Sequence, residues 1–167
     1  MAVVALVLAR PALGTNLVGT AAVALGLAVR GWAAGLLVKG GELCTAGPYR
    51  HVRHPLYLGS LLGAAGFCVM MNIVWGWVIV LPLFLLIYAA QVVAEERSLR
   101  GHYGDTYERW AREVPMLVPR LRGRPAGSST RWRWSQFLVN REQYHMVVTL
   151  LLVALFYLRA HWPVGGP

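Results

Sequence analysis

The chain has 167 residues, of which 57% are hydrophobic and 14% are charged. Soluble domains are closer to half apolar and a quarter charged, so this composition favours a membrane protein over an ordinary soluble domain. Lysine and arginine number 16 against 7 acidic residues, an excess typical of proteins that meet nucleic acid or a membrane surface.

The first apolar run covers residues 12–29, long enough to cross a bilayer core of about 30 Å at about 1.5 Å per residue. We expect Arg30 to end it. Residues 1–9 are also apolar, and their charge at Arg10 follows the apolar stretch instead of preceding it, so we expect a retained segment and not a cleaved signal peptide. The first predicted helix therefore covers roughly 3–29, and whether 1–9 cross the membrane stays open.

The second and third apolar runs, 55–71 and 73–94, are separated only by Asn72, a residue that favours tight reversals. Pro82 lies inside the third run, and membrane helices tolerate such a proline, sometimes with a kink. The two runs predict a helical hairpin.

A polar, arginine-rich segment follows the hairpin. It carries aromatic and leucine side chains at helical spacing, but Gly101 and Gly104 interrupt it, so we expect two short helices or one broken helix. The residues on the shared face are Leu99, Tyr103, Tyr107 and Trp110.

A fourth predicted membrane helix covers roughly 143–161. The fold expected is therefore an all-α integral membrane protein with four crossings in a single domain, 1–167. The segments 30–54 and 95–141 hold 14 of the 16 basic residues and fall on one side of the membrane in this topology. The positive-inside bias makes that side cytoplasmic and puts both termini outside, which leaves nucleic-acid binding without support.

The polar chemistry concentrates in GPYRHVRHPLYLG, residues 47–59. Pro55 suits the first turn of a helix, so His54 lies near the cap position, where the free N–H groups favour an anion. A hairpin brings His54 close to Glu95 and Glu96, whose charges oppose the helix dipole and require a cation, either Arg100 or a ligand amine or sulfonium. Only one of the two glutamates is expected to face the site.

Plainer interpretations of the same residues stay open. Arg50 and Arg53 also suit a role as topology anchors, and Glu95 and Glu96 suit a solvated helix end. No metal-ligand cluster, phosphate loop or nucleophile triad stands out in the sequence. We expect surface or interfacial positions for the histidines and ordinary apolar packing for the cysteines: His102, His145, His161, Cys44 and Cys68.

The first motif resembles G-P-Y-x-x-V-R-H-P-x-Y-x-G, and EERSLRGHYGDTYERWAREVPMLVP resembles E-E-x-x-L-x-x-x-[FY]-G-x-x-Y followed by V-P. Two such motifs around a hairpin are similar to the membrane methyltransferases of the isoprenylcysteine carboxyl methyltransferase and phospholipid methyltransferase group, over residues 43–119. The resemblance implies a cytoplasmic pocket for S-adenosylmethionine, with Gly59 allowing close helix approach. The contacts it implies come from Tyr49, Arg50, Val52, His54, Pro55, Tyr57, Glu95 or Glu96, Leu99 and Tyr107.

Methyl transfer from a sulfonium needs alignment and water exclusion more than acid catalysis. A thiol or amine acceptor would need a base, whereas a carboxylate would need a cation, for which Arg53 and Arg109 are the catalytic candidates.

The chain departs from this family pattern in residues 120–167, a basic loop and an extra membrane helix. We expect Glu142 to act there as a catalytic residue and Asn140 and Tyr144 to line the substrate side, because polar residues leading a membrane helix are functional candidates. The acceptor is predicted to be lipophilic and is otherwise left open.

The remaining expectations concern partners, location and alternatives. The composition indicates a bacterial inner-membrane protein with no obligate protein partner. One alternative is an NADPH-dependent sterol-type reductase, which shares R-H-P-x-Y-x-G, although Leu56 and Ser60 stand where those enzymes usually have asparagine and an acidic residue. Another is a non-catalytic membrane protein with a relict pocket.

Overall fold

The computed structural model describes residues 9–125, 127 and 130–161, and within these ranges it contains helices and no strands. The elements are α2 (Leu13–Ala34), the short 3-10 helix η1 (Gly47–Arg50), α3 (Pro55–Met71), the π-helical turn η2 (Gly76–Val80), α4 (Leu81–Tyr103), α5 (Asp105–Glu113), α6 (Trp134–Val139) and α7 (Glu142–His161).

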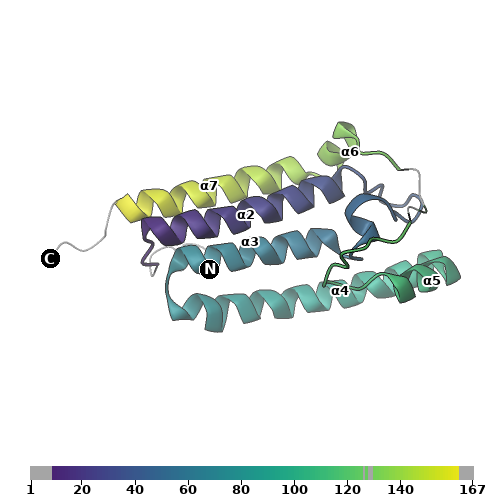
Figure 1. Cartoon of the computed structure of the whole chain (residues 1–167), viewed down its shortest axis with the longest axis horizontal. Coiled ribbons are helices and arrows are strands. Elements are labelled where there is room, and N and C mark those ends of the chain that lie inside the picture. The colour runs from purple at the N-terminus through teal and green to yellow at the C-terminus, as the bar shows by residue number, and fades with distance from the viewer. Residues whose placement is uncertain (1–8, 126, 128–129, 162–167) are drawn as a thin grey trace.

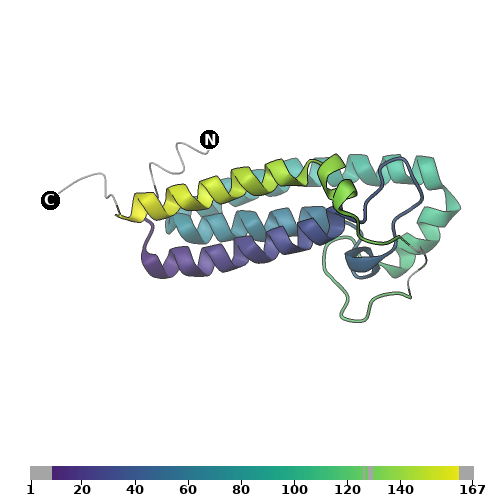
Figure 2. The ribbon, with the colours of Figure 1, turned by 90° about the horizontal axis from the view of Figure 1, so that it is seen from above.

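Four long helices, α2, α3, α4 and α7, lie alongside one another, and α5 and α6 gather at one end of this bundle (Figure 1). The turn between α3 and α4 lies at the other end (Figures 1 and 2). Both basic segments, 30–54 and 95–141, therefore meet at the end that carries α5 and α6, which we call the polar end.

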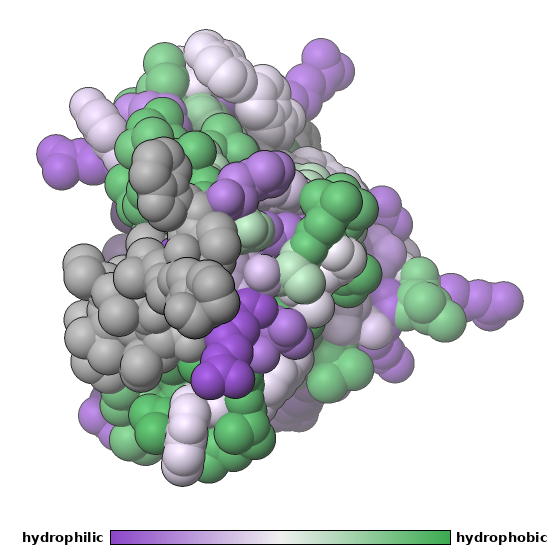
Figure 3. Space-filling model, turned by 90° about the vertical axis from the view of Figure 1, so that its left-hand side faces the viewer, coloured by the Kyte–Doolittle hydropathy of each residue, from purple (hydrophilic) through white to green (hydrophobic). Residues whose placement is uncertain are grey.

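Three helices are long and apolar enough to cross a membrane: Leu13–Ala34, Gly76–Tyr103 and Glu142–His161. Helix α3 is apolar but shorter, at 17 residues. Large apolar side chains such as Leu86 and Leu151 point outward, with 70% and 60% of their surfaces exposed. A bilayer would cover such outward apolar side chains. The end opposite the polar end carries both apolar and polar residues (Figure 3).

The hairpin prediction is confirmed at its first helix and its turn. Helix α3 covers 55–71 as expected, and Asn72 ends it in the left-handed conformation with φ of 50°. The third predicted helix, 73–94, ends later than expected. In the structure η2 and α4 together continue to Tyr103.

Within the described residues, the first predicted helix, 3–29, was wrong at both its start and its end. Helix α2 begins at Leu13, and residues 3–8 lie outside the described ranges. The helix runs through Arg30 to Ala34, because the guanidinium of Arg30 is paired with the carboxylate of Glu142 and so does not need to leave the bundle. The fourth helix begins at Glu142, one residue before its predicted start.

The break expected between Tyr103 and Tyr107 occurs at Gly104, whose φ of 50° is a conformation that glycine adopts readily. Gly101, in contrast, stays inside α4. The aromatic face predicted along this segment packs in one core cluster despite the break. Its members from the two helices are Leu99, Tyr103, Tyr107 and Trp110.

Glycines allow α2 and α3 to pack in very close contact. A Cβ atom added at Gly59 would lie 2.5 Å from the carbonyl oxygen of Gly26, and one added at Gly66 would lie 2.6 Å from that of Gly19. Side chains at these positions would force the helices apart, so small residues determine the approach of membrane helices here. The close approach expected at Gly59 is present.

We predict that Gly66→Ala destabilises the protein by about 2 kcal/mol, because the methyl group overpacks the α2–α3 contact. The matched control is Gly63→Ala, three residues earlier on α3, where a Cβ atom meets nothing within 4 Å. Thermal unfolding in detergent should show a lower Tm for the first variant and an equal or higher Tm for the second. Equal behaviour of the two variants would contradict the role assigned to Gly66.

Candidate active site

The residues before α3 form a tight loop that is held from outside by a later segment. His54 is the N-cap of α3 and Pro55 its first residue, as predicted. The backbone N–H of Arg53 donates to the carbonyl of Pro115, and that of His54 donates to the carbonyl of Met116. Pro115 and Met116, at the V-P end of the second motif, thereby satisfy two backbone donors of the first motif and hold the two motifs together.

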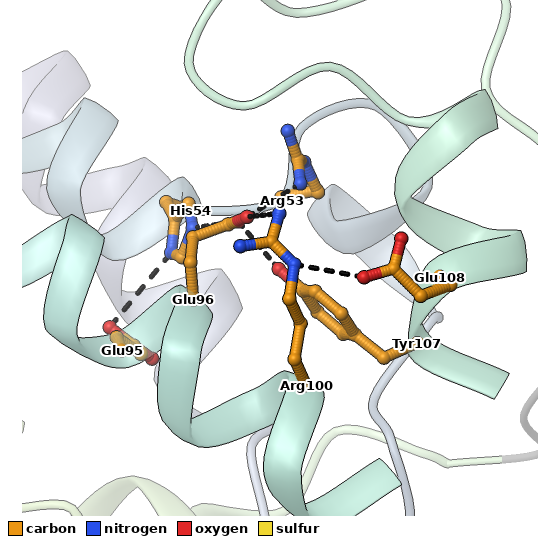
Figure 4. Close-up of polar contacts among 7 residues, drawn as sticks. All are labelled: Arg53, His54, Glu95, Glu96, Arg100, Tyr107 and Glu108. Atoms are coloured by element: carbon orange, nitrogen blue, oxygen red, sulfur yellow. Dashed lines mark hydrogen bonds and ion pairs between the residues drawn. The ribbon is translucent and has the colours of Figure 1, made fainter. Parts of the chain in front are cut away.

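The carboxylate of Glu96, which is 3% exposed, joins three elements at the polar end (Figure 4). It lies 2.8 Å from His54 Nε2, accepts from Arg53 at 2.8 Å and from the Tyr107 hydroxyl at 2.5 Å, and pairs with Arg100 at 3.2 Å. Arg100 is one of the cations that the sequence offers for this pair, and it also contacts Glu108 at 2.9 Å.

Tyr107 is fully buried and reaches Glu96 because the chain turns at Gly104 between α4 and α5. Burial, followed by the hydrogen bond to Glu96, holds the pKa of the Tyr107 phenol well above its usual value. The phenol therefore stays protonated at ordinary pH and remains a donor to the carboxylate.

Glu95 points in a different direction from Glu96, as expected for adjacent residues on a helix. Its carboxylate lies 3.9 Å from His54 Nδ1, and 41% of its side-chain surface is exposed. Figure 4 shows the two glutamates on either side of the His54 ring. Glu96 is therefore the buried member of the pair, and Glu95 is the partly exposed member.

A cavity of about 280 Å³, the first cavity, lies beside Glu95. Its walls come from the segment that follows α2, from η1, from the start of α3 and from α4 and α5. They include Leu37, Lys39, Glu42, Cys44, Tyr49, Arg53, His54, Pro55, Leu56, Tyr57, Glu95, Ser98, Leu99, Tyr103 and Trp110.

Three buried polar atoms of residues lining the first cavity have no hydrogen-bond partner within the described chain: the Tyr49 hydroxyl, Arg53 Nε and Trp110 Nε1. Buried polar groups are nearly always satisfied, so their grouping around one cavity marks it as a site for a polar ligand. Burial also raises the pKa of the Tyr49 phenol, which keeps its proton available for donation.

A second cavity, of about 610 Å³, lies among α2, α3, α4 and α7 and is almost entirely apolar. Its polar lining residues are Arg30, Ser60, Tyr88, His145 and Thr149. Both cavities have walls at the first turns of α3, although they share no described lining residue. Leu56 and Tyr57 line the first cavity, while Ser60 lines the second and the Tyr88 ring contacts the Tyr57 ring at 5.3 Å.

The guanidinium of Arg30 joins three helices beside the second cavity. Its Nε and Nη2 donate to the two carboxylate oxygens of Glu142 at 2.6 and 2.8 Å, and its Nη1 donates to the Ser60 hydroxyl at 2.5 Å and to the Leu56 carbonyl at 3.1 Å. Sequence reasoning missed this role for Arg30. The available signal was an arginine that extends an apolar run, combined with an acid at the start of a later one.

The predicted site residues separate into groups in the structure. Tyr49, Arg53, His54, Pro55, Tyr57, Glu95 and Leu99 line the first cavity. Glu96 and Tyr107 hold the network behind it, and Glu142 pairs with Arg30. The others lie elsewhere: Val52 is buried, Arg50 donates to the Arg124 carbonyl, Arg109 lines a separate hollow, Asn140 donates to the carbonyls of Ala34 and Leu37, and Tyr144 is 66% exposed.

His145 was expected at the surface or the membrane interface, but it is half-buried and lines the second cavity. Both cysteines are free and buried, as expected for apolar packing. Within the described residues, no group of three or more potential ligands is placed to hold a metal ion.

A family model described as phospholipid methyltransferase matches residues 4–106, more than half of the chain. The match includes the first motif, Arg30, the two glutamates and the first half of the second motif, and it ends before Tyr107. It begins and ends earlier than the 43–119 core expected from the motifs.

The relatives include a cobalt-zinc-cadmium resistance protein, CzcN, of Cupriavidus metallidurans, 36% identical over 50% of this chain and 38% of its own length. A methanethiol S-methyltransferase 2 of Bradyrhizobium diazoefficiens is 38% identical over 52% of this chain and 32% of its own length. A protein-S-isoprenylcysteine O-methyltransferase of Schizosaccharomyces pombe is 29% identical over 46% and 33%. The chain thus spans less than two fifths of these relatives, and no solved structure matches it.

We predict that Glu96→Gln destabilises the protein by about 3 kcal/mol, because the cations around Glu96 lose a buried carboxylate. Tyr107→Phe should cost only about 1 kcal/mol, the contribution of one hydrogen bond. Glu108→Gln, which weakens an exposed ion pair, is the control and should change stability by less than about 0.5 kcal/mol. Denaturant unfolding in detergent measures the free energy of unfolding of all three variants. A Glu96→Gln variant as stable as the control would contradict the central role of this carboxylate.

Proposed function

Because the chain belongs to the phospholipid methyltransferase family, we propose that it is an integral membrane methyltransferase that uses S-adenosylmethionine and a lipophilic acceptor. The observation that carries the proposal is the first cavity, where the partly exposed carboxylate of Glu95 and three unsatisfied donors lie near the start of α3. The match to the family model supports the reaction type.

The residues of the first cavity fit the chemistry of this cofactor. S-adenosylmethionine supplies an activated methyl group on a positively charged sulfur, and it also carries an ammonium, a carboxylate and ribose hydroxyls. The carboxylate of Glu95 suits the positive groups, and the N-terminus of α3 at Pro55 suits the carboxylate. The donors of Tyr49 and Trp110 suit oxygen or nitrogen acceptors on the ribose or base.

His54 and Arg53 would help to position the cofactor, and Glu96 would hold these two side chains in place. Their side chains are fixed by hydrogen bonds to that carboxylate and also line the first cavity. A wall held in one geometry reduces the ordering cost of binding and aligns the reacting methyl group.

The lipophilic acceptor would occupy the second cavity, which, like the first, has a wall at the first turns of α3. The two named methyltransferases among the relatives act on methanethiol and on isoprenylcysteine, and these names motivate both small and prenylated acceptors here.

For the membrane topology, we infer four crossings with α3 as the short fourth one, and a single domain over 1–167. The polar end would face the cytoplasm of a bacterial cell, because it collects most of the basic residues. The relatives reported above give no support to the reductase alternative.

We predict that the purified protein in detergent binds S-adenosylmethionine and S-adenosylhomocysteine in calorimetry, and that NADPH does not bind. Glu95→Gln should weaken S-adenosylmethionine binding by about tenfold or more, because it removes a charge that faces the ligand, while stability stays near that of the unmodified protein.

Glu108→Gln serves again as the control, since Glu108 lies outside the lining of the first cavity. Binding of NADPH alone would refute the proposed function. Unchanged S-adenosylmethionine affinity in the Glu95 variant would refute the assignment of Glu95.

A further inference from the structure

His145 has an unusual position for a histidine without an assigned role. It lies in the first turns of α7, is half-buried, and lines the apolar second cavity together with Arg30, Ser60 and Tyr88. Neither ring nitrogen has a hydrogen bond to another described residue. An imidazole with no partner, facing a cavity, has a free nitrogen that can accept a proton.

The cations near the second cavity are already paired. Among the described residues that line this cavity, the basic side chain other than histidine is Arg30. The guanidinium of Arg30 makes four hydrogen bonds, two to Glu142, one to Ser60 and one to the Leu56 carbonyl. The buried carboxylate of Glu142 also cancels its charge. An anionic acceptor in this cavity would therefore be desolvated without a free counter-ion, which is costly.

The two arginines proposed from the sequence to pair with a carboxylate do not change this result. Arg53 faces the first cavity and is bonded to Glu96, and Arg109 lines a hollow beside α5. Neither lines the second cavity. The chemistry of that cavity therefore favours a neutral acceptor group.

Building on the proposed function, we propose that the acceptor is an apolar molecule ending in a neutral, proton-bearing heteroatom, a thiol or a phenol, and that His145 is the catalytic base that removes its proton. The apolar part would occupy the cavity between α3, α4 and α7. The heteroatom would lie at the end where Arg30, Ser60, Tyr88 and His145 meet.

The proposed step balances in atoms and charge. A lone pair on the acceptor sulfur or oxygen forms a bond to the methyl carbon, and the bond between that carbon and the donor sulfur breaks, with its electron pair staying on the donor as a neutral thioether. The proton of the acceptor passes to the free imidazole nitrogen of His145. One positive charge thus moves from the donor sulfur to the imidazole of His145.

The position of the base relative to the methyl donor is consistent with this step. Leu56 and Tyr57 line the first cavity and Ser60 lines the second, so both cavities reach the first turns of α3, and Arg30 connects α2 to these turns through its hydrogen bonds to Leu56 and Ser60. His145 thus lines the cavity that reaches the same turns as the donor cavity, whereas His161 lies at the far end of the same helix.

The first test measures transfer of a labelled methyl group from S-adenosylmethionine to decanethiol. His145→Gln should lower kcat by about a hundredfold or more while leaving S-adenosylmethionine affinity unchanged, in line with the usual effect of a catalytic base. The matched control His161→Gln should keep full activity. His145→Ala should regain activity on addition of imidazole, a result that a purely structural role would not give.

The second test compares acceptors with matched tails: decanethiol against decanoate, and octylphenol against octylbenzoate. The thiol and phenol should be methylated at least about tenfold faster than the carboxylates, because the latter lack a free cation in the cavity. Faster methylation of the carboxylates, or an unchanged rate in His145→Gln, would overturn the inference. Either result alongside normal S-adenosylmethionine binding would leave the proposed function intact, whereas lost cofactor binding in the unmodified protein would overturn that function itself.

Discussion

The polar end of this molecule depends on one buried carboxylate. Glu96 lies on α4, yet its partners come from the loop before α3 and from α5, so a single side chain fixes three segments relative to one another. The bundle beyond it is largely apolar, and apolar contacts are less directional than hydrogen bonds. A buried charge that is satisfied only when His54, Arg53 and Tyr107 all reach it therefore favours one arrangement of these three segments.

The sequence predicted the parts of the fold that local patterns determine. The span of α3, the reversal at Asn72 and the approach of His54 to the glutamates all follow from hydrophobic run lengths and a hairpin. The pairing of Arg30 with Glu142 does not, because these residues are far apart in the chain and only the packing of α7 against α2 brings them together. The same packing brings His145 to the second cavity, where periodicity gives no signal.

The first turns of α3 are the meeting point of the candidate chemistry. Side chains from Leu56 and Tyr57 face one cavity and Ser60 faces the other, so two ligands held there would approach each other across less than two turns of one helix. The glycines that let α2 approach α3 also place Arg30 against this turn. Tight helix packing and placement of the site thus have the same structural origin.

Helix α4 has a mechanical consequence for access to the second cavity. Its buried residues are Val92 and Glu96, both toward the polar end, while its other end is tied to α3 by the turn at Asn72 and the π-helical turn. Helix α4 is therefore held at its two ends and has few buried side chains along its middle. Outward bending of that middle costs little packing energy, and it would open a lateral passage from the hydrocarbon of the bilayer to the cavity, with no need for a solute to cross the aqueous face.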